Sequence, residues 1–488
     1  MGLWAEKSHT ALYIFAGRMA FFMAAGQRGK DMTVGSPTRL ILFFSIPLLI
    51  GNIFQQLYNM VDTIIVGRCI DENALAAVGL TGPMSFLVIG FVMGLSSGFA
   101  VLVAQRFGAK DEEGMRHCVG ILIILAVTVT AAVTLLAVIF TRPLLRAINT
   151  PEELFGQSYQ YIVTIFSGIF TTVFYNVLAC ILRALGDSRT PLYFLMVSSV
   201  LNIGLDFLFI VNFGLGVMGA ALATVLSQAV SGVCCFLYIA KKYPVLRLSK
   251  KDFRWDFKLA AKHMGIGLPM AFQFSITAIG VIVLQGAINL FGESKIAAYA
   301  AASKVEQLVS QPAGTFGVTM ANFSGQNLGA GRVDRVRKGV RQASVLTLCF
   351  AVFGMIILLT CGEPLTRLFI KEDAGMVDEI IQASMHYLRI CAAFFPFLFM
   401  IFIYRNAMQG IGHSFMPLMG GVVELVVRCV AALTLPGLLD FTGVCLAGPF
   451  AWLSAAVLLC ISYFAVIRQV EKQYGRKQEE EISGTAIL

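Results

Sequence analysis

The sequence predicts an all-α polytopic membrane protein whose twelve transmembrane helices form two pseudo-symmetric six-helix bundles, arranged as a parallel repeat. Three observations predict it: the composition, a series of apolar runs and an internal repeat. The 488 residues are 57% hydrophobic and 13% charged, with a mean hydropathy of +0.79. Soluble proteins carry roughly 25% charged residues. The chain is therefore expected to lie in a lipid bilayer.

The apolar runs are each long enough to cross a hydrocarbon core of about 30 Å. The first six lie near 43–67, 80–105, 118–141, 159–182, 191–212 and 217–240, and the second six near 264–290, 297–322, 342–362, 383–404, 414–436 and 445–467. If both termini and every second loop are cytoplasmic, those segments hold 28 of the 37 Lys and Arg. By the positive-inside rule, this distribution places both termini in the cytoplasm, and we expect the protein to lie in the cell (inner) membrane. The same rule accounts for the net charge of +9, so the charge does not indicate a nucleic-acid partner.

An internal repeat divides the chain into two halves. The segment "VAQRFGAKDEEGMR" (103–116) aligns with "SGQNLGAGRVDRVR" (324–337) at an offset of 221, and "LRALGDSRTPL" (182–192) aligns with "MQGIGHSFMPL" (408–418) at 226. Six spans is an even number, so both halves start on the same side of the membrane. Paired halves around a central cavity are typical of transporters. A duplicated structural scaffold is the alternative, and it leaves the polar residues of the spans unexplained.

The repeat defines the expected domains. They are a cytoplasmic extension (1–38), a first bundle (39–240), a basic linker (241–262), a second bundle (263–468) and a cytoplasmic tail (469–488). The stretch "ALYIFAGRMAFFMAA" (11–25) is too short to span, so we expect either an interfacial helix or an overlong start. The tail "RKQEEEISGTAIL" is expected to be solvated and disordered. The eleven cysteines form no C-x-x-C pair and are interpreted as small buried hydrophobes.

A polar stripe runs down the first span. At about 100° per residue, its members fall within about 60° of their mean direction. They are Gln55, Gln56, Asn59, Asp62 and Thr63. A polar face on an otherwise apolar membrane helix indicates a protein interior or a watery cavity.

Two other spans bring polar groups to the same depth. Asn202 and Asp206 share one face of the fifth span, and Thr224 begins a polar series with Gln228 in the sixth. With a rise of about 1.5 Å per residue, Asp62, Asp206 and Thr224 all lie about 8 Å below the outer boundary. These oxygens suit Na⁺ as a hard cation. They also suit H⁺, because two neighbouring carboxylates resist ionising together.

The alternative is that both aspartates only satisfy buried hydrogen bonds. A charge inside a membrane helix costs at least about 2.5 kcal/mol, which favours a functional role. Pro47 lies fifteen residues before Asp62 and is either a hinge of the first span or an ordinary packing residue.

Polar residues of the second half fall into two groups. Glu424 and Arg428, four residues apart in the eleventh span, are expected to form a structural ion pair. Gln273 and Gln307 are candidates to line a central cavity together with Gln55, Gln56, Asn59 and Gln228. The sequence contains no P-loop motif, no H-E-x-x-H and no nucleophile elbow, so we expect neither an enzyme nor a bound cofactor other than H⁺ or Na⁺ as the coupling ion.

Several of these segments together resemble the multidrug and toxic compound extrusion (MATE) transporters. They are "IPLLIGNIFQQLYNMVDTIIVGR", "ALAAVG", "GQNLGAG", "LRALGDSRTP", "LNIGLDF" and "GAALATVLSQ". The resemblance covers about residues 35–470. It implies a V-shaped pair of bundles that exports organic cations against H⁺ or Na⁺. It also implies that Asp62, Asn202, Asp206 and Thr224 bind the coupling ion and that Pro47 is the kinking proline.

The chain departs from the NorM-type pattern within that family. NorM-type members carry an acid eight residues after a proline in the seventh helix, where this chain has Thr277 after Pro269, and another in the tenth, where "CAAFFPFLFMIFIY" has none. The pattern resembles the DinF-like members more, and coupling is expected in the first half.

The resulting hypothesis is a secondary active multidrug efflux transporter. It would export small amphipathic organic compounds, cationic ones in particular, by antiport with H⁺ or Na⁺, and it would act as a monomer in the bilayer. The alternatives are a flippase for lipid-linked precursors, which would favour a basic cavity, and a non-transporting receptor or scaffold, which would tolerate Asp206→Asn.

Overall fold

A computed structural model describes residues 31–370 and 376–485, and helices make up nearly all of them. The first half contains α2 (Pro37–Cys69), α3 (Glu72–Gly108), α4 (Glu112–Ala147), α5 (Glu152–Ser167), α6 (Ile169–Ala184), α7 (Arg189–Asp206), the π-helix η1 (Phe207–Asn212) and α8 (Gly216–Lys242). The second contains α9 (Phe257–Ile288), α10 (Glu293–Gly329), α11 (Val333–Arg367), α12 (Val377–Gly410), α13 (Phe415–Thr434), α14 (Pro436–Leu439) and α15 (Phe441–Thr485). Three short 3₁₀ turns complete the chain: η2 (Pro244–Leu246), η3 (Lys250–Phe253) and η4 (Asn289–Phe291).

Length and hydropathy support the predicted spans. Ten helices of the described residues are long and apolar enough to cross a membrane, and the α5–α6 pair, bent by 45°, raises the number to 11 if it counts as one span. The remaining predicted span corresponds to α10, which is long enough to cross a membrane, but its most apolar stretch is less apolar than those of the other ten helices. The all-helical membrane fold predicted from the sequence is thus confirmed.

The two repeated motifs end four helices in the same way. The left-handed residue that closes α3 is Lys110 (φ 57°), and its counterpart after α10 is Gly331 (φ 70°). Gly186 (φ 82°) and Gly412 (φ 87°) close α6 and α12 in the same manner. At each end, two backbone amides past the helix bond to carbonyls within its last turn, which is the Schellman arrangement. The sequence repeat is therefore a repeat of local structure.

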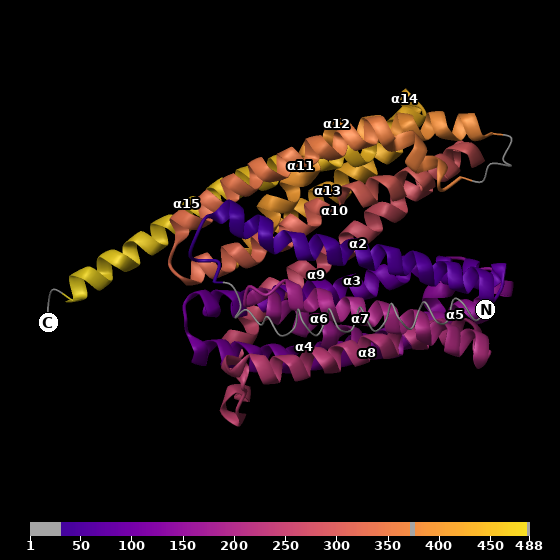
Figure 1. Cartoon of the computed structure of the whole chain (residues 1–488). Coiled ribbons are helices and arrows are strands. Elements are labelled where there is room, and N and C mark those ends of the chain that lie inside the picture. Colours follow the sequence, from indigo (N-terminus) through magenta and orange to yellow (C-terminus); the bar gives the residue numbers. More distant parts are fainter. Residues whose placement is uncertain (1–30, 371–375, 486–488) are drawn as a thin grey trace.

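The helices form two lobes. Helices α3–α8 make the first lobe and α9–α15 the second, while α2 runs between them (Figure 1). Each lobe has its own cluster of buried hydrophobic side chains. We call the end of the molecule that carries the linker (243–256) the linker end, and the other the opposite end.

Helix α2 passes from one lobe to the other along its length. Near the linker end, Ile41 and Phe44 belong to the core of the second lobe. Near the opposite end, Ile65 and Val66 pack with side chains of α8 and η1 in the first lobe. The polar stripe of α2 thus lies on a helix that packs against the second lobe at one end and the first lobe at the other.

Three local features differ from the sequence-based expectations. The fourth span is broken at Gly168, where α5 and α6 meet at 45°, and a Cβ at this bend would lie 2.2 Å from Val225 Cγ2 of α8. The fifth span ends in a π-helix. The tail is helical as far as Thr485 instead of disordered, and the Tyr474 hydroxyl donates to the Leu328 carbonyl at 3.2 Å. The extension before residue 31 lies outside the described residues.

Candidate cation-binding site

The site begins at the point where α7 changes its helical geometry. Asp206 is the last residue of α7, and η1 follows at once. Single π-helical turns are frequent at functional sites because they redirect side chains and backbone groups. Asn202 lies one turn earlier on the same face, and both side chains are fully buried.

Asp62 of α2 completes a pair of carboxyl groups with Asp206. The two side chains lie within hydrogen-bonding reach of each other. Each keeps one buried oxygen, Oδ1, that receives no hydrogen bond from the described residues. Carboxylates are acceptors only when ionised. Two of them in contact therefore need a proton or a metal cation between them.

A neutral shell of amide and hydroxyl groups surrounds the pair. With its amide oriented to satisfy both neighbours, Asn202 donates to Asp206 Oδ2 at 2.9 Å and accepts from the Thr224 backbone amide at 3.1 Å. The Thr224 hydroxyl lies 3.4 Å from the Tyr58 hydroxyl. The structure thus brings together Asp62, Asn202, Asp206 and Thr224, the four residues predicted from depth and spacing.

The residues present fit a proton or a hard cation held by oxygen. Among the described residues, no group of three or more His, Cys, Asp or Glu side chains could form a transition-metal site. The two unsatisfied carboxylate oxygens are the atoms that could hold a cation, and the Thr224 hydroxyl is an additional oxygen ligand. The Asn202 oxygen is already occupied by a backbone amide, which favours a proton over a cation that needs several ligands.

The other residues of the polar stripe are more accessible. Gln55 and Asn59 are exposed, and Gln56 is half-buried. In α8, Gln228 has a buried side-chain oxygen without a hydrogen-bond partner. Gln307 of α10 is exposed. Their assignment to a substrate cavity stays a prediction.

Pro47 is buried inside α2, and the helix passes through it without interruption. A hinge at this position stays a prediction.

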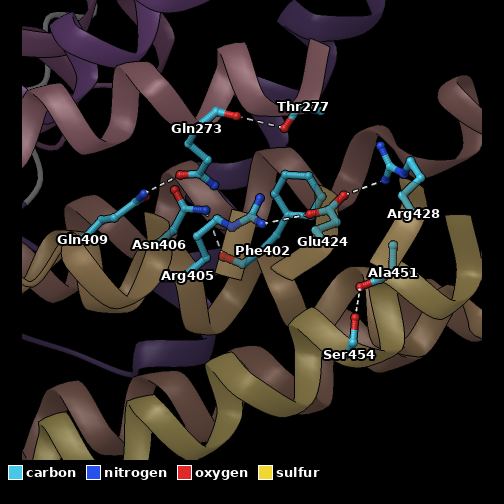
Figure 2. Close-up of polar contacts among 10 residues, drawn as sticks. All are labelled: Gln273, Thr277, Phe402, Arg405, Asn406, Gln409, Glu424, Arg428, Ala451 and Ser454. Carbon is cyan, nitrogen blue, oxygen red and sulfur yellow. Dashed lines mark hydrogen bonds and ion pairs between the residues drawn. The ribbon is translucent and has the colours of Figure 1, made fainter. Parts of the chain in front are cut away.

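A second set of buried polar groups lies inside the second lobe (Figure 2). Glu424 of α13 accepts from Arg428 at 2.7 Å and from Arg405 of α12 at 3.1 Å. The amide oxygen of Gln273, correctly oriented, accepts from Arg405 Nη1 at 2.8 Å and from Nε at 2.7 Å. The amides of Gln273 and Gln409 are also in contact at 2.8 Å. The predicted ion pair is present, but Gln273 lies in this buried chain of polar groups and not on an open wall.

Sequence reasoning missed several residues of these two sites, among them Tyr58, Tyr161 and Arg405. Tyr58 lies one turn before Asp62, and its i, i+4 spacing could have indicated it. Tyr161 of α5 is close enough to both aspartates to interact with their charges, and nothing in its sequence neighbourhood marks it. Arg405 lies one residue beyond the predicted tenth span (383–404), whereas α12 continues to Gly410 and buries its side chain.

A family model, related sequences and solved structures all match this chain to multidrug transporters of one family. The MatE family model matches residues 47–208 and 269–434, once in each half. The probable multidrug resistance protein YoeA of Bacillus subtilis (strain 168) is 30% identical over 342 residues, which are 69% of this chain and 74% of that protein. The probable multidrug resistance protein YpnP of the same organism is 26% identical over 385 residues, 79% of this chain and 85% of that protein.

The fold is shared with a solved structure described as the outward-facing conformation of a multidrug resistance MATE family transporter. The TM-score is 0.84 at 24% identity, and the match covers 92% of this chain and 100% of the other.

Proposed function

This chain belongs to the MatE family of multidrug efflux transporters, and from that premise we propose that it exports organic compounds in exchange for a cation bound between Asp62 and Asp206. The cation is a proton in this proposal. The substrates are small amphipathic compounds, and cationic ones above all, because the carboxyl pair favours positive charge.

One observation carries the proposal: the carboxyl groups of half-buried Asp62 and fully buried Asp206, from different helices, lie within hydrogen-bonding reach of each other, and each retains a buried oxygen with no donor among the described residues. Such a pair has no structural need for both charges, since one asparagine would satisfy the same contacts with no repulsion. A proton entering the pair removes the repulsion and lets α2 and α7 approach. Loss of that proton separates them, so occupancy of the pair is coupled to the arrangement of the helices.

The direction of transport follows from charge and gradient. Basic residues gather at the linker end, which we place in the cytoplasm together with both termini. Protons then enter from the opposite end, where the Asp62–Asp206 pair lies. One elementary charge moving inward across 100 mV supplies about 2.3 kcal/mol, enough for a useful gradient of substrate. Both carboxyl groups of the pair belong to one chain, so the proposed transporter acts as a monomer.

The test is export of ethidium from proteoliposomes under a pH gradient and, separately, a Na⁺ gradient. Wild type should export ethidium under the pH gradient, and Asp62→Asn and Asp206→Asn should each abolish that export. Asp440→Asn is the matched control: Asp440 is exposed, and asparagine tolerates its positive φ of 53° equally well.

Each other outcome has a defined meaning. Export driven by Na⁺ alone would replace the proton with Na⁺ at the same site. Export that persists in both aspartate variants would overturn the assignment of the site.

A further inference from the structure

The repeated motifs of the sequence meet in space, across the boundary between the two lobes. Gln105 closes α3 in the first lobe, and its side-chain amide donates to the carbonyl of Gly410, at the end of α12, at 3.0 Å. Gln326 closes α10 in the second lobe, and its amide donates to the carbonyl of Ala184, at the end of α6, at 2.8 Å. The two glutamines are equivalent in the repeat, and so are the two acceptors. The contact is therefore made twice, once in each direction.

Two equivalent glycines let the same helix ends cross at backbone contact. A Cβ added to Gly108 would lie 1.9 Å from the carbonyl oxygen of Gln326, and one added to Gly329 would lie 1.8 Å from that of Gln105. Neither distance leaves room for any side chain, and the obstructing atoms belong to the backbone of the opposite lobe. Small residues at such crossings allow helices in membranes to approach this closely.

Among the described glycines of α3, those that approach the second lobe lie in the half of the helix nearer the linker end. Along α3, a Cβ at Gly98 would lie 2.4 Å from Gly267 Cα of α9, and one at Gly94 would lie 2.6 Å from the Met270 carbonyl. Further toward the opposite end, Gly82 and Gly79 have no atom within 4 Å of the added Cβ. The lobes are thus joined at the linker end and diverge beyond it.

Gln326 also binds the segment that precedes α2. Its side-chain oxygen accepts from the backbone amide of Met32 at 2.9 Å, and the Met32 carbonyl accepts from Asn327 and from Arg335, each at 3.2 Å. Met32 is fully buried, five residues before α2 begins. The segment that leads into α2 is therefore attached to the same crossing.

We propose that the two Gln-x-x-Gly motifs, Gln105–Gly108 and Gln326–Gly329, form a reciprocal latch that holds the lobes closed at the linker end and must open once in each transport cycle. The proposal rests on the transport function stated above, because only alternating access requires the lobes to separate at this end. The glutamines act as positioning residues and contact no substrate. The latch also explains why the motif is repeated: each copy supplies the glutamine and the glycine that its counterpart needs.

The test is hydrogen–deuterium exchange of the full-length protein in lipid nanodiscs. Gly108→Ala should speed exchange about tenfold or more in the second-lobe segments 324–332 and 408–413, which do not contain the substitution. Gly329→Ala should do the same in the first-lobe segments 103–111 and 182–187. Gly82→Ala is the matched control on the same helix and should leave all four segments unchanged. Helix propensity alone predicts the opposite sign, because alanine stabilises a helix relative to glycine.

Two further variants keep the proposal testable if the alanine substitutions prevent folding. Gln105→Ala and Gln326→Ala should each speed exchange in the opposite lobe about fivefold. Tyr243→Phe removes a bond of 2.7 Å to Asp187 at the same end but within one lobe, and it should change nothing across the boundary. Unchanged exchange in the opposite lobe in every folded Gly and Gln variant would overturn the latch.

The readout needs no substrate and no ion gradient. If the variants change exchange as expected but the protein fails to export ethidium, the reciprocal contact between the lobes stands, and its opening in a transport cycle falls together with the proposed function. If hydrogen–deuterium exchange is unchanged in every variant while ethidium export is intact, the proposed function stands and the latch is overturned.

Discussion

Replacing Glu424 with glutamine tests how far the charged chain of the second lobe stabilises the fold. Glu424 is shared by two arginines, at 3.1 Å from Arg405 and 2.7 Å from Arg428. All three side chains are nearly buried, with exposed fractions of 12%, 9% and 8%. Glu424→Gln keeps the shape of the side chain but leaves two buried guanidinium groups without their common negative charge.

The expected loss follows from that geometry. Removing one partner of a buried ion pair costs roughly 3–5 kcal/mol, because the other charge stays desolvated. The chain also offers a control with the same i, i+4 spacing at the surface. Glu363 and Arg367 are 2.9 Å apart, and both are 50% exposed. Such an exposed pair contributes about 0–1 kcal/mol.

The assay is the free energy of unfolding in mixed detergent micelles, measured by titration with sodium dodecyl sulfate. Glu424→Gln should lower it by about 3 kcal/mol or more, and Glu363→Gln by less than about 1 kcal/mol. Equal effects of the two substitutions would refute the reasoning that burial, and not the pairing itself, sets the contribution of Glu424.

Three further predictions concern single residues. Asn202→Ala removes the amide that donates to Asp206, so ethidium export should fall several-fold, and unaltered export would show that the amide does not tune the site. Gly168→Ala forces a Cβ against a valine of α8, so the unfolding free energy should drop by about 1–3 kcal/mol, and a raised melting temperature would count against this packing. In the linker, the Ser249 backbone amide and hydroxyl donate to Asp252 at 2.7 and 2.8 Å and hold its pKa below the usual range. The stabilisation by Asp252 is then present above about pH 4 and lost as the pH falls through the lowered pKa, a dependence that Asp252→Asn should remove from acid titrations of stability.

Fixed helix geometry is the reason that the first-lobe site could be predicted from the sequence. Asn202 and Asp206 are four apart, so they share a face whatever the surroundings. The depths of Asp62 and Thr224 follow from a constant rise per residue in helices that cross the same slab. Length and apolarity likewise predicted the spans, because a bilayer demands a minimum of both.

Features that depend on neighbouring helices could not be predicted in this way. Gly168 is one glycine in an apolar run, and nothing in that run predicts the bend of 45° or the approach of Val225 of α8. Arg405 lies where polarity predicts the end of a span, yet Glu424 and Gln273 provide partners that let α12 continue. The repeat was visible in the sequence, but its reciprocal contact across the lobes needed the spatial arrangement.

The most direct test of the account is proton release when ethidium binds to the purified protein in weakly buffered detergent solution. If ethidium displaces a proton from the Asp62–Asp206 pair, wild type should release protons when ethidium binds. Asp62→Asn and Asp206→Asn should bind ethidium without releasing protons. Proton release that persists in both variants would contradict the central claim that this pair holds the coupling ion.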